Sequence, residues 1–124
     1  MLMKALRIGL GRLILLGDAV TRPRPQRRST QGQAMVEKEA ARLSLYQFHA
    51  CPFCVKTRRA LHRLNVSMTL HDAKNDPVQR GRLLAGGGKV KVPCLHIQED
   101  GQSRWLYESN AIIAYLEQRF AGIV

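Results

Sequence analysis

The chain of 124 residues has room for one domain with one modest hydrophobic core. Its formal net charge of +11 suits an anionic partner, but aromatic residues make up only 6% of the chain and follow strand or helix patterns, which argues against a stacking surface for nucleic acid. The three cysteines are odd in number and two of them form a CxxC pair. This pattern argues against a secreted disulfide framework and favours a reducing compartment, so we expect a cytoplasmic protein.

Residues 1–20 are predicted to form an amphipathic helix, with the apolar residues on one broad side. The opposite side carries Lys4, Arg7, Gly11 and Asp18. The longest run without a charge, from Leu13 to Gly17, is far shorter than the roughly 20 residues that cross a bilayer. We therefore expect residues 2–28 to contact an anionic membrane surface, which would make the protein peripheral at the membrane.

Other interpretations of this helix remain open. An organellar transit peptide is also amphipathic, rich in arginine and poor in acids, so an organelle is the alternative location. A secretory signal fits less well because Arg12 interrupts the apolar region. The helix can also simply pack on its own domain or on a partner.

Residues 21–42 are predicted to be a basic linker with a short lead-in to the first strand. Pro23 and Pro25 exclude a continuous helix, while arginines and other polar residues keep the segment solvated. We expect only a short, exposed helix over residues 36–42 before the strand begins.

The stretch LSLYQFHACPFCVKTRRALHRL, residues 43–64, contains the strongest chemical signal. A buried strand ends at a Cys-Pro-Phe-Cys turn, and Pro52 suits the first position of a helix. Cys51 then falls at the N-cap, where free backbone N–H groups and the positive end of the helix favour a thiolate. Cys54 lies one turn further on and is close enough to attack a disulfide formed on Cys51. The sequence therefore predicts a redox site with Cys51 and Cys54 as catalytic residues.

The remaining chain alternates strands and helices. A strand over residues 66–72 should run parallel to the first, and a helix begins at Pro77 and ends at Gly86–Gly88. Residues 92–97 and 103–107 are typical of a β-hairpin, and Ser109 is predicted to cap a terminal helix. The predicted order is β-α-β-α-β-β-α, an α/β fold with a four-stranded mixed sheet.

This layout resembles the thioredoxin fold and specifically the glutaredoxin family. The resemblance covers about residues 43–121 and rests on the CPFC turn, on Val92-Pro93 about forty residues later, and on the hairpin that leads into a capped helix. It implies a glutaredoxin-like domain over residues 43–124. It also implies a thiol–disulfide oxidoreductase that reduces protein–glutathione mixed disulfides or protein disulfides, with glutathione as co-substrate and no metal.

The resemblance also implies a glutathione site. Pro93 is expected to follow a cis peptide bond, with the backbone of Val92 pairing with the cysteinyl backbone of glutathione; the alternative is a trans proline that merely starts an edge strand. Glu108 and Ser109 look like the γ-glutamyl site of the glutathione-transferase N-terminal domain, where glutaredoxins usually have a different sequence. The alternative is that Ser109 is only a helix cap and Glu108 only favours the helix dipole.

The partner of the glycine carboxylate is less certain, because His49-Ala50 stands where many glutaredoxins have a basic residue. Lys56 is the first choice, and Arg82, Lys89 and Lys91 are the other candidates. Phe53 is expected to be an exposed ring that shapes the groove. Cys94 is expected to be a small buried residue; a metal site of Cys51, Cys54, Cys94 and His49 would be a poor zinc signature.

Rival functions are a module that binds an iron–sulfur cluster between two copies of Cys51 and two glutathiones, and a glutathione-binding domain of the transferase type. A transferase would normally need a helical second domain for its electrophile, and the sequence reaches only Val124. We therefore expect little conjugating activity. A tethered interaction domain without turnover is a third possibility.

Overall fold

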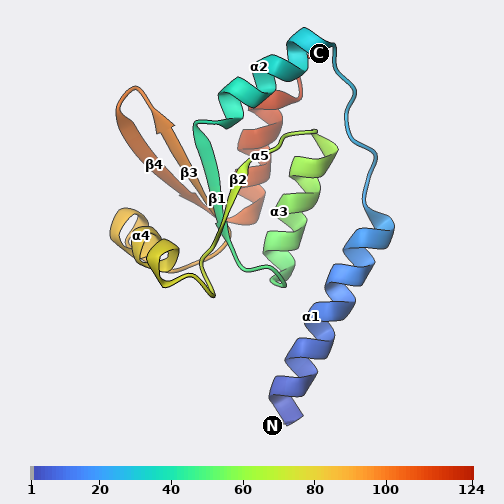
Figure 1. Cartoon of the computed structure of the whole chain (residues 1–124), viewed down its shortest axis with the longest axis vertical. Helices are drawn as coiled ribbons and strands as arrows, with labels where there is room; N and C mark the ends of the chain where they lie inside the picture. The colour runs from blue at the N-terminus through green and yellow to red at the C-terminus, as the bar shows by residue number, and fades with distance from the viewer. Residues whose placement is uncertain (1) are drawn as a thin grey trace.

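The structure, a computed structural model, describes residues 2–124 and has the predicted order of elements over the second part of the chain (Figure 1). Its helices are α1 (Leu2–Thr21), α2 (Thr30–Ala40), α3 (Pro52–Arg63), α4 (Pro77–Gly87) and α5 (Ser109–Phe120). Its strands are β1 (Leu43–Gln47), β2 (Thr69–Asp72), β3 (Cys94–Glu99) and β4 (Gln102–Tyr107).

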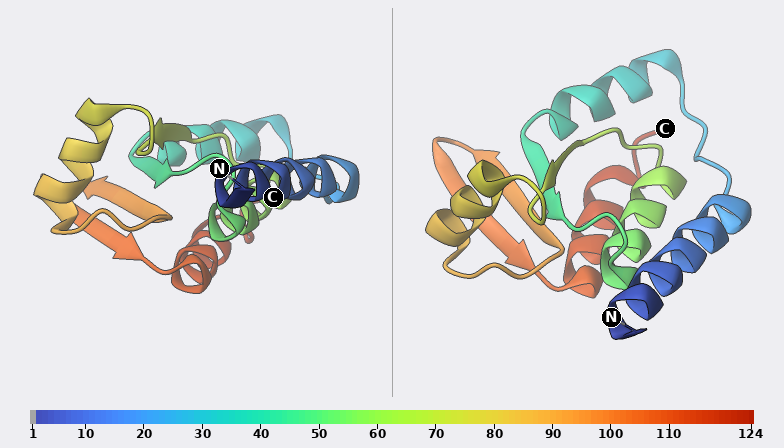
Figure 2. Two further views of the ribbon diagram at one scale, coloured as in Figure 1. Left: turned by 90° about the horizontal axis from the view of Figure 1, so that it is seen from below. Right: turned by 60° about the horizontal axis from the view of Figure 1, so that its bottom comes forward.

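The four strands form one mixed sheet, as predicted, and their order in it is β2-β1-β3-β4. β1 pairs in parallel with β2 and antiparallel with β3, and β3 pairs antiparallel with β4. Helices α3 and α5 lie on one face of the sheet and α4 lies on the other (Figures 1 and 2). The fold is therefore the thioredoxin-like α/β arrangement.

The main hydrophobic core lies between the sheet and the helices α2, α3 and α5. Alternate residues of β1, Leu43 and Leu45, point into this core, while Tyr46 joins a smaller cluster under α4. From the terminal helix α5, Ile112, Leu116 and Phe120 are buried in the core, as its apolar side predicts.

Helix α2 is longer and more buried than predicted. It begins at Thr30, where the Ser29 side chain accepts a hydrogen bond from the Gly32 N–H at 3.0 Å, and Val36 and Ala40 lie fully within the core. The prediction of a short, exposed helix over residues 36–42 is therefore wrong. Its apolar residues are too few to show a helical period, and only their contacts with β1 reveal the buried side.

The segment between α1 and α2 is held by the end of the chain. Arg28 donates hydrogen bonds to the carbonyl oxygens of Ile123 at 2.7 Å and Phe120 at 3.0 Å, and the Gln26 N–H donates to the Arg63 carbonyl at 2.8 Å. Carbonyls at the end of a helix lack partners within the helix, and the guanidinium supplies donors for them. The segment between α1 and α2, which we expected to be a solvated spacer, is thus partly anchored to the domain. The domain boundaries at residues 20 and 42 stay a prediction.

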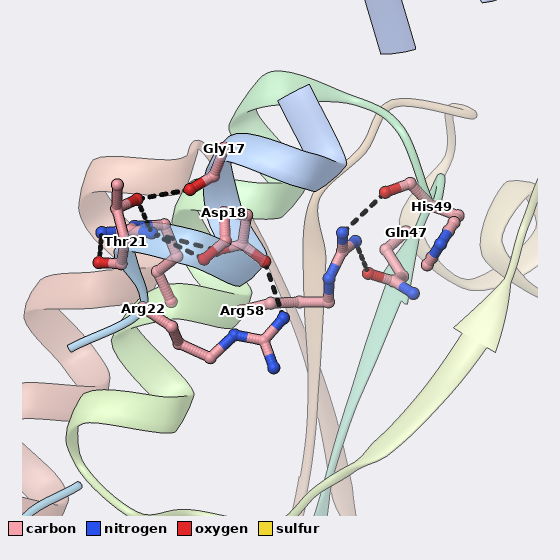
Figure 3. A network of polar contacts seen from close by, with 8 residues as sticks. Gly17, Asp18, Thr21, Arg22, Gln47, His49 and Arg58 are labelled. Atoms are coloured by element: carbon pink, nitrogen blue, oxygen red, sulfur yellow. Dashed lines mark hydrogen bonds and ion pairs between the residues drawn. The ribbon is translucent and has the colours of Figure 1, made fainter. Parts of the chain in front are cut away.

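Helix α1 packs beside α3 (Figure 2). Its polar side faces α3, because Asp18 on that side pairs with Arg59 of α3. Asp18 is buried and forms ion pairs with Arg22 at 3.0 Å and Arg59 at 3.2 Å; Figure 3 shows Asp18, Thr21 and Arg22 in this network. Burial alone would raise the pKa of Asp18, but the two guanidinium groups outweigh it and hold that pKa below its usual value.

The apolar side of α1 faces outward. Four of its large apolar residues are more than half exposed, Leu10 58%, Leu13 66%, Leu16 61% and Val20 76%, while Ile14 and Leu15 are partly buried. Of the interpretations open for this helix, the structure shows packing on its own domain. The side of α1 that packs is the polar side. Across the described residues 2–124, no helix is both long enough and apolar enough to cross a membrane.

Candidate functional site

The CPFC turn places one cysteine at the surface and one in the interior. Cys51 occupies the N-cap of α3 with extended backbone angles, φ −70° and ψ 128°, and Pro52 is in the first turn. Its carbonyl accepts the first helical hydrogen bond, from the Val55 N–H at 2.8 Å. Cys51 is partly exposed, whereas Cys54 is fully buried, and both are free thiols. The sulfur open to solvent is therefore the one at the positive end of the helix.

The surroundings of Cys54 keep its proton in place. Burial raises the pKa of the Cys54 thiol to about 12, and a hydrogen bond to Cys51 adds to that effect, against a hydrogen bond from the Phe48 N–H at 3.4 Å. Cys54 is therefore a thiol at neutral pH and can donate its S–H to a thiolate on Cys51. The pair therefore consists of a partly exposed cysteine at the helix N-terminus and a buried, protonated thiol beside it.

Arg58 fixes the strand end that leads into the turn. Its guanidinium donates to the Gln47 side-chain oxygen at 2.5 Å and to the His49 carbonyl at 2.6 Å (Figure 3). Burial lowers the pKa of this arginine, which nevertheless stays a cation at neutral pH. The sequence alone assigns Arg58 no role, because its positioning role depends on how α3 packs against the end of β1.

A hollow of about 250 Å³ lies between the first turn of α3, the Val92-Pro93 segment and the start of α5. It is lined by all six residues predicted to bind glutathione: Phe53, Lys56, Val92, Pro93, Glu108 and Ser109. The Val92–Pro93 peptide bond is cis, as the resemblance implies, and the Phe53 ring is 62% exposed. The structure thus brings together residues from three separate segments, and their binding of glutathione stays a prediction.

Two more residues line this hollow that the sequence did not assign to it. Lys91, which the sequence offered only as an alternative to Lys56, forms an ion pair with Glu108 at 2.9 Å, and this contact holds the pKa of Glu108 below its usual value. Asn110 accepts a hydrogen bond from the Lys56 ammonium at 2.6 Å. The only sequence signals for them are their positions beside Val92 and Ser109.

Ser109 does not cap α5 as predicted. Glu108 holds the cap position in an unusual backbone conformation, φ 78° and ψ 118°, and Ser109 is the buried first residue of the helix. The Glu108 side chain makes no capping hydrogen bond. The first N–H groups of α5 therefore have no side-chain cap, and Ser109 and Asn110 at this end of the helix line the hollow, which suits a carboxylate ligand.

The other candidates for the glycine carboxylate lie elsewhere. Arg82 lines a different hollow, under α4, and Lys89 lies over the Tyr107 ring with its ammonium 4.7 Å from the ring centre. Cys94 is fully buried beside Tyr46, and burial raises the pKa of its thiol to about 11. Among the residues that the structure describes, no group of three or more His, Cys, Asp or Glu side chains is placed to hold a metal ion.

Comparisons with known proteins find similar proteins by sequence and by structure. The profile of the family "Glutathione S-transferase, N-terminal domain" matches residues 45–122. Glutaredoxin 2 of Escherichia coli strain K12 is 29% identical over 76 residues, which cover 61% of this chain and 33% of the relative. The chain thus spans about a third of the length of the curated relative it matches.

Solved structures share the fold. A maleylacetoacetate isomerase from Anaeromyxobacter dehalogenans 2CP-1, solved with dicarboxyethyl glutathione and citrate in its active site, has a TM-score of 0.50 and 25% identity, over 64% of this chain and 37% of its own. Glutathione transferase Omega 3C of Trametes versicolor has a TM-score of 0.54 and 18% identity, over 80% and 43% of the two chains. At that identity the second likeness shows the fold alone.

Proposed function

The chain belongs to the family of glutathione S-transferase N-terminal domains, and we propose that it acts there as a glutathione-dependent thiol–disulfide oxidoreductase of the glutaredoxin type. Its distant sequence likeness to glutaredoxin 2 supports a thiol redox role in general. The observation that carries the specific proposal is the division of the CPFC pair: Cys51 is accessible at a helix N-terminus, and Cys54 is a buried thiol that can donate to it.

The reaction begins with the Cys51 thiolate. It attacks the glutathionyl sulfur of a protein–glutathione disulfide, so that a Cys51–glutathione disulfide forms and the substrate disulfide breaks. The electron pair leaves on the protein sulfur, which takes up a proton. A second glutathione then attacks the Cys51 disulfide and releases oxidised glutathione. Alternatively, Cys54 loses its proton and attacks the Cys51 sulfur, which forms an internal Cys51–Cys54 disulfide, while glutathione leaves and takes up a proton.

The hollow beside α3 is the proposed site for the glutathionyl group. The Val92 backbone would pair with the cysteinyl part, and the N-terminus of α5 at Ser109 would receive the γ-glutamyl carboxylate. Glu108 would receive the ammonium of the same group and exchange it for its present partner, Lys91. Lys56, on the α3 side of the hollow, would attract the glycine carboxylate.

We also propose that α1 contacts an anionic membrane surface. Its outward apolar residues and the exposed arginines at its edges and beyond, Arg7, Arg12, Arg24 and Arg27, together match the composition of an interfacial helix. Each basic residue near an anionic surface adds about 1 kcal/mol of attraction. Such contact would keep the redox site close to substrates at the membrane, while the location of the protein in the cell stays a prediction.

The test of the proposed function is the reduction of a glutathionylated protein by glutathione with purified full-length protein. We expect turnover that Cys51→Ser abolishes and Cys54→Ser largely retains, with Cys94→Ala as the matched control that leaves it unchanged. Equal loss in the Cys51 and Cys54 variants would point to a strictly dithiol reductase. Conjugation of a small electrophile without disulfide turnover, or a coloured iron–sulfur dimer without it, would overturn the proposal in favour of the rival functions.

A further inference from the structure

A second hollow, here called the α1 groove, lies between α1 and the turn that carries Cys51 and has a volume of about 280 Å³. Cys51 itself lines it. Its walls are otherwise mostly apolar and are formed by Leu10, Gly11, Ile14, Phe48, Ala50 and Pro52. None of the residues proposed to hold glutathione lines this groove, so it is a separate space, and Cys51 lies in its wall.

Helix α1, which forms one wall of the groove, contacts the rest of the domain near its C-terminal end and again near its middle. Asp18 and Thr21 bind the Arg59 guanidinium of α3, at 3.2 Å through the Asp18 carboxylate and 2.9 Å through the Thr21 carbonyl. Further along α1, a Cβ at Gly11 would lie 3.1 Å from the Ala50 Cβ, which is tighter than ordinary packing. The glycine thus lets α1 approach the residue just before Cys51, and the groove is a feature of the packed helix.

The two hollows meet the first turn of α3 at adjacent residues, since Pro52 lines the α1 groove and its neighbour Phe53 lines the hollow proposed for glutathione. A mixed disulfide whose glutathionyl half occupies that hollow would have its other half beside Cys51, in the α1 groove. The half that enters the α1 groove is the leaving thiol.

The charged residues and the volume of the α1 groove indicate which kind of leaving thiol it can bind. Arg7 and Lys74 are exposed and line the groove, and within the described part of the chain neither side chain has an ion-pair or hydrogen-bond partner. The neighbouring Asp72 is engaged locally, since its carboxylate accepts the backbone N–H groups of Lys74 and Asn75. The volume lies just below the range typical of sites for drug-sized ligands, so the space suits a small molecule.

We propose that the α1 groove binds the leaving half of small glutathione mixed disulfides in which that half is an aliphatic thiol with a carboxylate at its far end. This specificity rests on the proposed function. The element that supplies it, α1, lies outside residues 45–122, which match the family. Cys51 attacks the glutathionyl sulfur, the substrate disulfide breaks, and the carboxylated thiolate leaves through the groove and takes a proton from water. Glutathione then regenerates Cys51 and is itself oxidised to the disulfide.

The test compares three glutathione mixed disulfides with similar leaving groups: those of mercaptohexanoate, mercaptohexanol and mercaptopropanol. For the full-length protein we expect kcat/KM about tenfold higher for mercaptohexanol than for mercaptopropanol, because three more methylenes are partly buried. The carboxylate of mercaptohexanoate should add about threefold, as for an exposed charge pair. Equal kcat/KM for the three substrates would overturn the proposal.

Matched variants on the same helix assign the effect to the groove. Leu10→Gln should reduce the chain-length preference to about twofold, whereas Leu13→Gln, at a leucine that is also exposed but outside the groove, should leave it unchanged. Arg7→Gln should remove the carboxylate preference, and Arg12→Gln should not. Equal effects within either pair would contradict a role of the groove.

A second measurement separates the groove from the proposed function. The alkylation rate of Cys51 by N-hexyl iodoacetamide relative to iodoacetamide needs no glutathione. If none of the three disulfides is reduced, the proposed oxidoreductase function fails; a preference for the hexyl reagent that Leu10→Gln removes and Leu13→Gln keeps would still support the apolar groove. Absence of that preference would overturn the groove as a binding site, whatever the disulfides do.

Discussion

The backbone N–H of Phe48, the residue directly after β1, donates to the buried sulfur of Cys54 at 3.4 Å. This hydrogen bond links the end of β1 to the second cysteine of the turn. Despite this donor, burial and the neighbouring Cys51 raise the pKa of the Cys54 thiol to about 12. The two cysteines, one helical turn apart, are therefore not equivalent. Cys51 is partly open to solvent, whereas Cys54 is a buried thiol that keeps its proton at neutral pH.

This difference predicts selective alkylation. At neutral pH, iodoacetamide should modify Cys51 and leave Cys54 and Cys94 intact, because the pKa values of the two buried thiols are raised to about 12 and about 11. Peptide mapping by mass spectrometry after a brief reaction measures this directly. Comparable labelling of Cys54 in the folded protein would contradict the assignment of roles.

The contact of α1 with α3 should weaken in acid. The pKa of Asp18 is lower in the folded protein than in the unfolded chain, so its contribution is present above the unfolded value near about 3.9 and is lost as pH falls through the folded value. Amide exchange in α1, corrected for its intrinsic pH dependence, should therefore rise between about pH 5 and about pH 2. Asp18→Asn should exchange about tenfold faster at pH 7 and lack this acid dependence; an acid dependence equal to that of the wild type would refute the ion pairs as its cause.

Glu108 offers a test of the glutathione site. Glu108→Gln removes the charge proposed to receive the γ-glutamyl ammonium, and should raise KM for glutathione about five- to tenfold, as expected for an exposed ion pair that a ligand partly shields. The maximal rate should change little, because the sulfur chemistry is untouched. Glu117→Gln is the matched control, since Glu117 is also an exposed, ion-paired carboxylate but lies on the far part of α5. Equal KM values for both variants would argue against this placement.

Vesicle binding tests the proposed membrane contact. The full-length protein should co-sediment with vesicles that contain phosphatidylserine and remain in solution with phosphatidylcholine alone. Leu16→Gln, on the outward side of α1, should weaken binding about tenfold, because burial of a leucine in the interface is lost. Leu84→Gln, at an exposed leucine of α4, is the control. Equal loss in both variants, or equal binding to neutral vesicles, would contradict the prediction.

Much of the fold and of the site could be predicted from local sequence. The CPFC turn, the prolines at the starts of α3 and α4, and the hairpin signals determine local structure strongly, so the order of elements was predicted. The family resemblance, and not local structure, pointed to the six predicted residues that line the hollow beside α3. The wrong or missing parts depend on distant contacts. A Cβ at Gly32 would clash with the Val124 carbonyl, so the start of α2 depends on a residue at the far end of the chain.

The orientation of α1 is a second example. Its wide apolar side predicts burial by the usual rule for amphipathic helices, yet the side with Gly11 and Asp18 faces the domain. A local pattern cannot reveal this, because the deciding partner, Arg59, lies 38 residues or more along the chain and is presented by another helix. The α1 groove beside Cys51 depends on the same contact between α1 and Arg59. It could therefore not be predicted from the local sequence either.

The most direct test of the central proposal is to locate glutathione on the protein during the reaction. The Cys54→Ser variant, mixed with a glutathionylated peptide in the absence of free glutathione, should release the peptide thiol and carry one glutathione on Cys51, as measured by mass spectrometry of the intact protein and its peptides. A protein without glutathione, or with glutathione on Cys94 instead, would contradict the proposed chemistry.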